Sequence, residues 1–382
     1  MILTEAKTLQ DDNAARFAWS NLRRYLNTDF VEDQLCRLHE VPAKQRGNAK
    51  KQARQIRYCL MQAREYADAA ERVSLVTKPT LFYYSTMCLA LAEILLKQTG
   101  DASLDRARED HRHHGLLFSA GTPGKGRPSL DVAASALRAK PAMNIEGRFG
   151  TFELWHRSCR ETPVSGKFTD RRGMGTTTQH TVIAAGSDAR LALLPKSGLD
   201  FMQVLKKIPG LLAHLGAMNI QSDLIRARLE RERPSATTGL MTLLIHPTPD
   251  PQLTTFMTNC KFDPNACELI NFHEIHFGGH LDLNINDVFG PVRFNLPHGS
   301  MWNEEEVRFW PSDQPLNEFG YYYVALFIIG NYARYYPDRW IADVECSTEL
   351  ALVVEELLRA AETRVPLLAL SELSRIYYVM PS

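Results

Sequence analysis

The chain has 382 residues, of which 45% are hydrophobic and 23% are charged, a composition typical of a globular protein with a buried core. Its 44 basic residues balance its 44 acidic residues, which excludes binding to nucleic acid or anionic membranes through overall charge. Seven cysteines, an odd number without a C-x-x-C pair, argue against a disulfide framework and a thiolate zinc site.

The N-terminal third is predicted to be helical. Apolar residues at spacings of three and four predict helices over residues 12–40 and 48–70. The clearest helix, Pro79–Gln98, is apolar on both faces, which is typical of a buried helix. Glu93 is the exception within this apolar helix, and a carboxylate that is buried requires a polar or charged partner. A loop over residues 100–126 follows, and then a short helix within 130–139.

From about Ile145 the sequence becomes rich in short β-type segments. Glycine and proline separate predicted strands at Gly150–Trp155, Thr178–Ala184, Leu240–His246, Glu268–Phe277 and His280–Ile285. An apolar helical stretch at Leu199–Leu215 is interrupted by Pro209, and mixed charges predict a helix over Asp223–Arg233.

Helices return near the C-terminus. Asn317–Tyr336 is the second helix that is apolar on nearly every side, and amphipathic helices follow at Thr348–Thr363 and Leu367–Tyr377. Because two such helices cannot both face solvent, we expect them to pack together. This predicts an α+β fold whose helical core is built from both ends of the chain, with a β-rich central insertion. The expected divisions are an N-terminal helical part, a β-rich central unit and C-terminal helices packing on the first part, at 1–145, 146–315 and 316–382.

The two apolar helices also carry a family resemblance. The segments KPTLFYYSTMCLALAEILL, HGLLF and LNEFGYYYVALFIIGNYARYYPDRW are similar to those of the YaaC-like proteins, bacterial proteins of unassigned function. The polar positions that support the resemblance are Lys78, Pro79, His114, Gly115, Tyr335, Trp340 and Pro366. The resemblance implies a bacterial cytoplasmic protein with a helical frame and supplies no catalytic residues.

Two basic segments are candidate nucleic-acid contacts. The first contains Lys44, Arg46, Lys50, Lys51, Arg54 and Arg57 with no intervening acid, and the second is a predicted loop at Thr169–Thr178 containing Arg171 and Arg172. Such groups can neutralise several phosphates, while Tyr58 and Tyr66 can stack on bases. The alternative is that the first segment is the outer face of an amphipathic helix paired with acids elsewhere.

An arginine and histidine cluster follows the first apolar helix, and its members are Arg106, Arg108, His111, His113 and His114. Its spacing resembles the Arg/His signature of HEPN ribonucleases. Histidine can transfer a proton at a ribose hydroxyl, and arginine can hold the scissile phosphate. The alternative is a turn whose histidines cap a helix end.

Other sites are not expected. Three histidines between His273 and Asp282 suggest a metal site, but strand alternation and the Gly278–Gly279 turn separate their side chains. The glycine-rich segment at Gly121 lacks the serine or threonine of a P-loop, and no dinucleotide fingerprint or nucleophile elbow occurs. The sequence therefore predicts neither a metal nor a cofactor.

These features predict a non-enzymatic binding or scaffold subunit of a bacterial complex, in antiviral defence or nucleic-acid processing. The alternative is a HEPN-type, metal-independent ribonuclease that uses the Arg106–His114 cluster. The expected partners are another protein or a second copy of the chain, with RNA or DNA as a further ligand and no membrane. A cytoplasmic location is expected because the sequence shows no signal-peptide pattern and no long apolar run.

Overall fold

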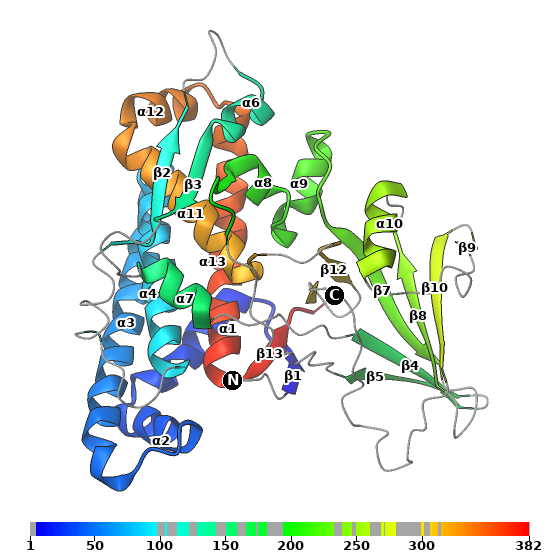
Figure 1. The fold of residues 1–382 in the computed structure, drawn as a ribbon, viewed down its shortest axis with the longest axis horizontal. Helices are drawn as coiled ribbons and strands as arrows, with labels where there is room; N and C mark the ends of the chain where they lie inside the picture. The colour runs from blue at the N-terminus through cyan, green and yellow to red at the C-terminus, as the bar shows by residue number, and fades with distance from the viewer. Residues whose placement is uncertain are drawn as a thin grey trace.

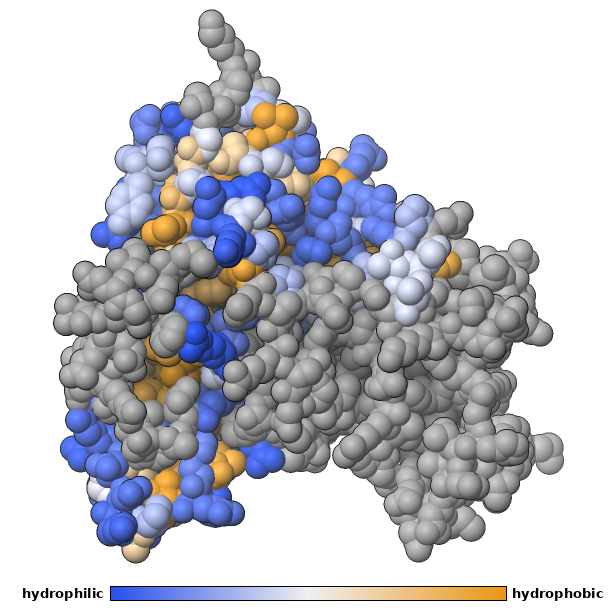
Figure 2. All heavy atoms as spheres, in the orientation of Figure 1, coloured by the Kyte–Doolittle hydropathy of each residue, from blue (hydrophilic) through white to orange (hydrophobic). Residues whose placement is uncertain are grey.

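The structure is a computed structural model in which α-helices form one tall body and a β-sheet lies beside it (Figure 1). It describes residues 5–97, 104, 113–121, 128–142, 150–158, 166–172, 175–181, 194–232, 239–246, 250–259, 269–270, 272–279, 299–301, 306–311 and 315–381. On the face in view, described side chains are mostly hydrophilic, and the apolar ones form small separate patches (Figure 2).

The N-terminal helices lie where they were predicted, except that one predicted helix is split into two. Helices α3 (Arg46–Arg72) and α4 (Lys78–Lys97) confirm the two predicted after residue 48. The helix predicted over 12–40 is two helices, α1 (Ala14–Leu22) and α2 (Thr28–Leu38), joined by a 3-10 turn. Asn27 causes the division, because its side chain caps α2 by accepting hydrogen bonds from the backbone N–H groups of Asp29 and Phe30.

The C-terminal part contains α11 (Glu318–Tyr335), α12 (Pro337–Glu345) and α13 (Glu349–Ser374), followed by strand β13 (Ile376–Val379). Pro337 therefore begins a helix that was not predicted, because proline is accepted in the first helical turn. Pro366 lies inside α13, so the prediction of two helices there is wrong. Strand β13 pairs in parallel with β1 (Glu5–Thr8), which joins the two ends of the described chain.

Helices α4 and α11 pack directly against each other. The Tyr83 ring lies 5.5 Å from that of Phe327 and 6.0 Å from that of Tyr323, measured between centroids. Gly330 permits this approach, because a Cβ atom there would lie 3.1 Å from Tyr83 Cβ. The Thr80 hydroxyl donates a hydrogen bond of 3.2 Å to the Gly330 carbonyl. The predicted helical core built from both ends of the chain is confirmed.

Helix α4 is long and apolar enough to span a membrane when judged by length and composition alone. However, 72% of its apolar window is buried inside the fold, as in the core helix of a globular protein.

A buried ion pair links α11 to α13. The Arg364 guanidinium donates to both Glu318 carboxylate oxygens over 2.6 and 2.9 Å, and both side chains are 1% exposed. Arg364 also donates to the Tyr377 hydroxyl over 3.1 Å, which brings strand β13 into the same network. Bidentate geometry of this kind is what allows two charges to remain in a protein interior.

A small sheet covers part of the helical core, in the strand order β2-β3-β6. Its strands are β2 (Leu116–Ala120), β3 (Leu137–Pro141) and β6 (Leu199–Asp200), accompanied by α6 (Leu130–Ser135), α8 (Phe201–Leu205) and α9 (Leu212–Ala217).

This part of the chain differs from one prediction and agrees with another. The loop predicted over residues 100–126 is wrong for Leu116–Ala120, which form strand β2. The expected interruption at Pro209 is confirmed, because a 3-10 turn starts there. Phe201 and Leu205 of α8 belong to the main core, and the three-part division of the chain stays a prediction.

Helix α7 (Thr151–Ser158) lies where a strand was predicted at Gly150–Trp155. Phe152, Trp155 and His156 are all buried, and their spacing of three and four residues places them on one helical face. Trp155 stacks on Tyr323 of α11 with ring centroids 5.8 Å apart. Burial against α11 therefore explains the helix better than the local strand propensity does.

The second sheet has the strand order β11-β12-β7-β8-β10-β9, and its pairings are antiparallel. Its elements are β7 (Ile225–Glu232), β8 (Gly239–Ile245), β9 (Leu269–Ile270), β10 (Phe272–Gly279), β11 (Gly299–Met301), β12 (Val307–Phe309) and α10 (Asp250–Asn259), with a separate hairpin of β4 (Gly166–Arg172) and β5 (Gly175–Thr181). The helix predicted over Asp223–Arg233 is wrong, because Ile225, Ala227 and Leu229 alternate with charged residues, which is a strand period.

Glu93 in α4 has the buried partners that its position required. Its carboxylate accepts hydrogen bonds from Trp155 Nε1 over 2.9 Å and from Lys97 Nζ over 3.4 Å. Lys97 also contacts Glu372 of α13 over 2.7 Å. Burial raises the pKa of Glu93 to about 7, while the Lys97 ammonium acts in the opposite direction.

We expect Glu93 to make the folded state less stable as pH rises from about 4.5 to about 7. The reason is that the folded state holds the Glu93 proton more tightly than the unfolded state does. Glu93→Gln should remove this contribution, so the variant should gain stability relative to the wild type over that pH range. Urea unfolding at several pH values measures the effect, with the exposed Glu345→Gln as the control. A difference between variant and wild type that does not change with pH would contradict the prediction.

Candidate functional site

The predicted basic segment lies on α3 and the turn before it, and its first residues are neutralised by α2. Arg46 forms ion pairs with Glu32 over 3.1 Å and with Asp33 over 2.7 Å. Lys50 lies 3.6 Å from Asp29. Lys44 is exposed in the turn Ala43–Gln45. The pairing with acids elsewhere therefore accounts for Arg46 and Lys50.

The following basic residues remain accessible. Arg54 and Arg57 are exposed, and neither forms an ion pair with any residue that the structure describes. The Tyr58 side chain beside them is 56% exposed, and Met61 one turn later is 45% exposed. Spacings of three and four residues place these side chains on one side of the helix. We call this surface the α3 basic face, and its members are Lys51, Arg54, Arg57, Tyr58, Met61 and Arg64.

The second predicted basic segment is not a loop. Arg171 and Arg172 are the last residues of β4 and pair with Thr176 and Gly175 of β5. The prediction of a loop at Thr169–Thr178 is wrong, because the residues described on either side of 173–174 pair as antiparallel strands.

The histidine segment after residue 272 lies in strand β10 up to Gly279, whereas His280 and Asp282 lie outside the described residues. His273 and His276 occupy positions of opposite parity in β10, opposite Ile245 and Thr242 of β8. Within the part of the chain that the structure describes, no group of three or more His, Cys, Asp or Glu residues is placed to hold a metal ion.

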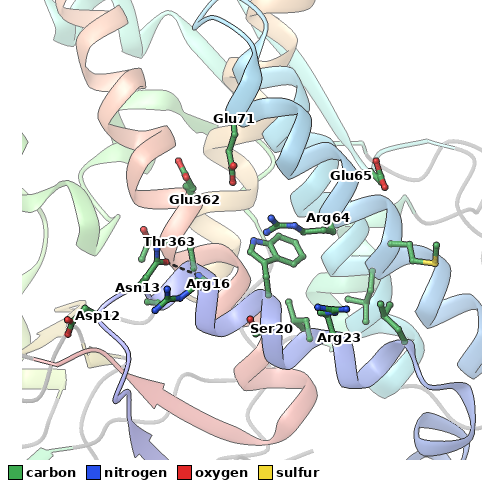
Figure 3. A pocket seen from close by; sticks show the side chains of 17 residues that line it. Asp12, Asn13, Arg16, Ser20, Arg23, Arg64, Glu65, Glu71, Glu362 and Thr363 are labelled. Carbon is green, nitrogen blue, oxygen red and sulfur yellow. Dashed lines mark hydrogen bonds between the residues drawn. The ribbon is translucent and has the colours of Figure 1, made fainter.

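A pocket of about 850 Å³ lies between α1, α3 and α13 (Figure 3). We call it the Trp19 pocket. Its wall includes the apolar side chains Leu60 and Met61 of α3 and the indole of Trp19 from α1. Its charged lining residues are Asp12, Arg16, Arg23, Arg64, Glu65, Glu71 and Glu362. No sequence motif predicted this pocket, because α13 is far from α1 and α3 in the chain.

The charges of the Trp19 pocket are only partly paired. The Arg64 guanidinium lies over the Trp19 ring, 5.2 Å from its centroid, and pairs with Asp68 over 2.5 Å. The Arg16 guanidinium lies 2.9 Å from Asp11 and lowers the pKa of that carboxyl. Arg23 forms no ion pair with the described residues.

The carboxylates of Glu71 and Glu362 likewise form no ion pair with the described residues. Glu71 extends into the pocket from α3, and Glu362 extends towards it from α13 (Figure 3). Arg16 and Arg23 lie on the α1 side of the same pocket, away from these acids. The pocket therefore has an acidic side with Glu71 and Glu362, an α1 side where Arg16 and Arg23 lie together with Asp12, and an apolar wall. Arg64 joins the pocket to the α3 basic face.

A second candidate site contains His114. Arg106, Arg108 and His111 lie outside the described residues, whereas His113 and His114 form the turn before β2. His114 Nδ1 lies 3.0 Å from the Tyr83 hydroxyl of α4. The ring lines a groove of about 280 Å³, together with Leu116, Leu117, Phe118, Phe327, Asn331, Tyr335 and Tyr336.

The backbone around His114 is held firmly. The carbonyls of His113 and His114 accept hydrogen bonds from the N–H groups of Thr151 and Phe152, at the start of α7. Gly115 adopts a positive φ of 84°, and a Cβ atom at Gly150 would lie 1.9 Å from Gly115 Cα. Only glycine fits at both positions, because a side chain at either one would clash with the other segment.

The electrostatic environment of His114 favours the neutral imidazole. Burial lowers the pKa of His114, and the Arg334 guanidinium of α11 lowers it further. Arg334 donates to the Tyr84 hydroxyl over 2.8 Å. His113, by contrast, uses Nδ1 to accept the Gly115 backbone N–H over 3.0 Å, which is a structural role. The arrangement can therefore present one neutral base, His114, to the groove.

Comparison with known proteins supports the family resemblance over part of the chain. The family model of the YaaC-like Protein matches residues 20–122, which confirms the resemblance over that segment. No curated protein and no solved structure matches the chain. The matched segment contains α2, α3, α4 and β2, and therefore both the α3 basic face and the His114 turn.

Proposed function

Because residues 20–122 match the YaaC-like family, to which no function is assigned, we propose a function from the chemistry of the surfaces. We propose that the chain is a non-enzymatic subunit of a bacterial complex and that its α3 basic face binds single-stranded nucleic acid. The observation that carries this proposal is that Arg54 and Arg57 are exposed, form no ion pair with the described residues, and lie beside the exposed ring of Tyr58. A cytoplasmic location and a role in antiviral defence or nucleic-acid processing belong to the same proposal.

The charges of the α3 basic face suit a phosphate backbone. Arginine binds phosphate oxygens through a planar, bidentate set of N–H groups. Each phosphate neutralised on a single strand releases counterions, which makes the affinity fall as salt is added. Because the overall net charge is zero, this attraction must be local to the face.

The aromatic side chain of the face favours a single strand over a duplex. Tyr58 is 56% exposed and lies next to Arg57. Exposed rings stack on unpaired bases, a contact that contributes about 1–3 kcal/mol per base. The bases of a duplex already stack on each other and do not offer these faces.

The variant Arg54→Glu/Arg57→Glu should bind a labelled single-stranded RNA of about 20 nucleotides at least tenfold more weakly than the wild type, because two phosphate contacts become repulsive. Fluorescence anisotropy at several salt concentrations measures both the affinity and its salt dependence. The slope of log affinity against log salt should fall by about 1.4 in Arg54→Ala/Arg57→Ala, at about 0.7 per phosphate.

The matched control is Lys140→Glu/Lys196→Glu, which makes the same change of charge at two exposed lysines away from α3. This control should bind as the wild type does. An equal loss in both variants would show that binding depends on overall charge, and an absence of binding by the wild type would remove the nucleic-acid part of the proposal.

The His114 groove favours a second candidate function, a HEPN-type ribonuclease that requires no metal. A held, neutral histidine can take the proton of a ribose hydroxyl, and Arg334 lies close enough to affect its pKa. Arg106 and Arg108, the arginines of the predicted cluster, lie outside the described residues.

If this second function holds, the protein should cleave single-stranded RNA in the presence of EDTA. His114→Ala should then lower the cleavage rate at least ~100-fold, the usual contribution of a general base. His214→Ala on α9 is the control and should retain full activity. Cleavage that persists in the triple variant His111→Ala/His113→Ala/His114→Ala would contradict the assignment.

A further inference from the structure

We infer that the Trp19 pocket binds one guanine nucleotide of the strand held by the α3 basic face. This inference rests on the proposed function, because Arg64 belongs to both the pocket and the face. The pocket volume of about 850 Å³ lies within the usual range for small-molecule sites. The assignment to guanine follows from the three kinds of surface that the pocket offers.

The first surface is the apolar wall, which suits a planar base. Trp19, Leu60 and Met61 line the pocket from two helices. Proteins that hold a base outside a duplex place it against aromatic and apolar side chains of this kind. Arg64 already lies against the Trp19 ring, so its planar guanidinium extends the surface on which a base can stack.

The second surface is the α1 side, where Arg16 and Arg23 can bind a phosphate beside the carboxylate of Asp12. Arg23 forms no ion pair with the described residues, and the Arg16 side chain is 71% exposed despite its contact with Asp11. Ala14 and Ala15, in the first turn of α1, also line the pocket. Their N–H groups have no partner within the helix, and the helix dipole adds attraction for an anion.

The third surface is the acidic side, whose carboxylates exclude an anionic ligand that carries no hydrogen-bond donors. Glu71 and Glu362 form no ion pairs with the described residues and would repel inorganic phosphate alone. A suitable ligand must therefore bring hydrogen-bond donors to these carboxylates as well as a phosphate to the arginines. A nucleotide has both features, at opposite ends of one molecule.

The donor pattern of the base selects guanine. Guanine carries two adjacent donors, N1–H and the N2 amino group, which match the two oxygens of one carboxylate. Adenine, cytosine and uracil place an acceptor beside each Watson–Crick donor, and a carboxylate repels that acceptor. We therefore expect the carboxylate of Glu362 or Glu71 to accept both hydrogen bonds from guanine. The phosphate of the same nucleotide should then lie near Arg16 and Arg23.

Isothermal titration calorimetry of the full chain with GMP, inosine monophosphate, AMP and inorganic phosphate tests the inference. We expect GMP to bind most tightly and inosine monophosphate, which lacks the N2 amino group, to bind at least fivefold more weakly. Guanosine without phosphate should also bind more weakly than GMP. Equal affinity for GMP and AMP, or no saturable binding of GMP, would overturn the inference.

Variants identify the groups responsible. Glu71→Gln/Glu362→Gln should remove the preference for GMP over AMP, and Arg23→Ala should remove the difference between GMP and guanosine. Unchanged preferences in correctly folded variants, checked by thermal unfolding, would also overturn the inference. Arg54→Glu/Arg57→Glu should retain GMP binding while losing affinity for the longer RNA, so a failure of the α3 basic face is distinguishable from a failure of the pocket.

Discussion

The burial of α11 is the constraint on which the rest of the structure depends. Every residue from Glu318 to Gly330 is buried, so this helix has no face that it can leave in water. Its surroundings are α4, α8, α12, α13 and strands β2 and β3, which come from both ends and the middle of the chain. Glu318 is the one acid within it, and Arg364 compensates the cost of burying that charge. Helix α3 contacts α4 on the outside of this core, which leaves its basic face exposed.

Helices whose own amino-acid composition indicates that they are buried could be predicted from the sequence. Helices α4 and α11 are apolar on all sides, so their existence and their mutual packing followed from composition alone. Elements whose form depends on distant partners could not be predicted. Helix α7 is held by Tyr323, and β1 pairs with β13 across nearly the whole chain. The mixed charges of β7 favour an exposed helix, whereas the alternation of its apolar residues has the period of the strand that the structure contains.

The candidate sites divide in the same way. The exposure of Arg54 and Arg57 follows from helical spacing within one element, so the sequence could indicate it. The neutralisation of Arg46 depends on the position of α2, which no local pattern specifies. The Trp19 pocket requires α1 and α13, which the chain separates by more than 300 residues, and neither carries a motif. The contact of His114 with Tyr83 likewise depends on the packing of β2 against the helical core.

The joining of both chain ends in one core has a consequence for synthesis on the ribosome. Helix α4 emerges long before α11, and roughly 220 residues separate them, which at about 5–20 residues per second corresponds to about 10–45 s. During that interval the surface that later packs on Tyr323 and Phe327 has no native partner. Helix α3 can already cover one face of α4, but the face that α11 later covers stays exposed and can bind a chaperone or another nascent chain. Premature termination anywhere before Glu318 would leave that face of α4 permanently without α11.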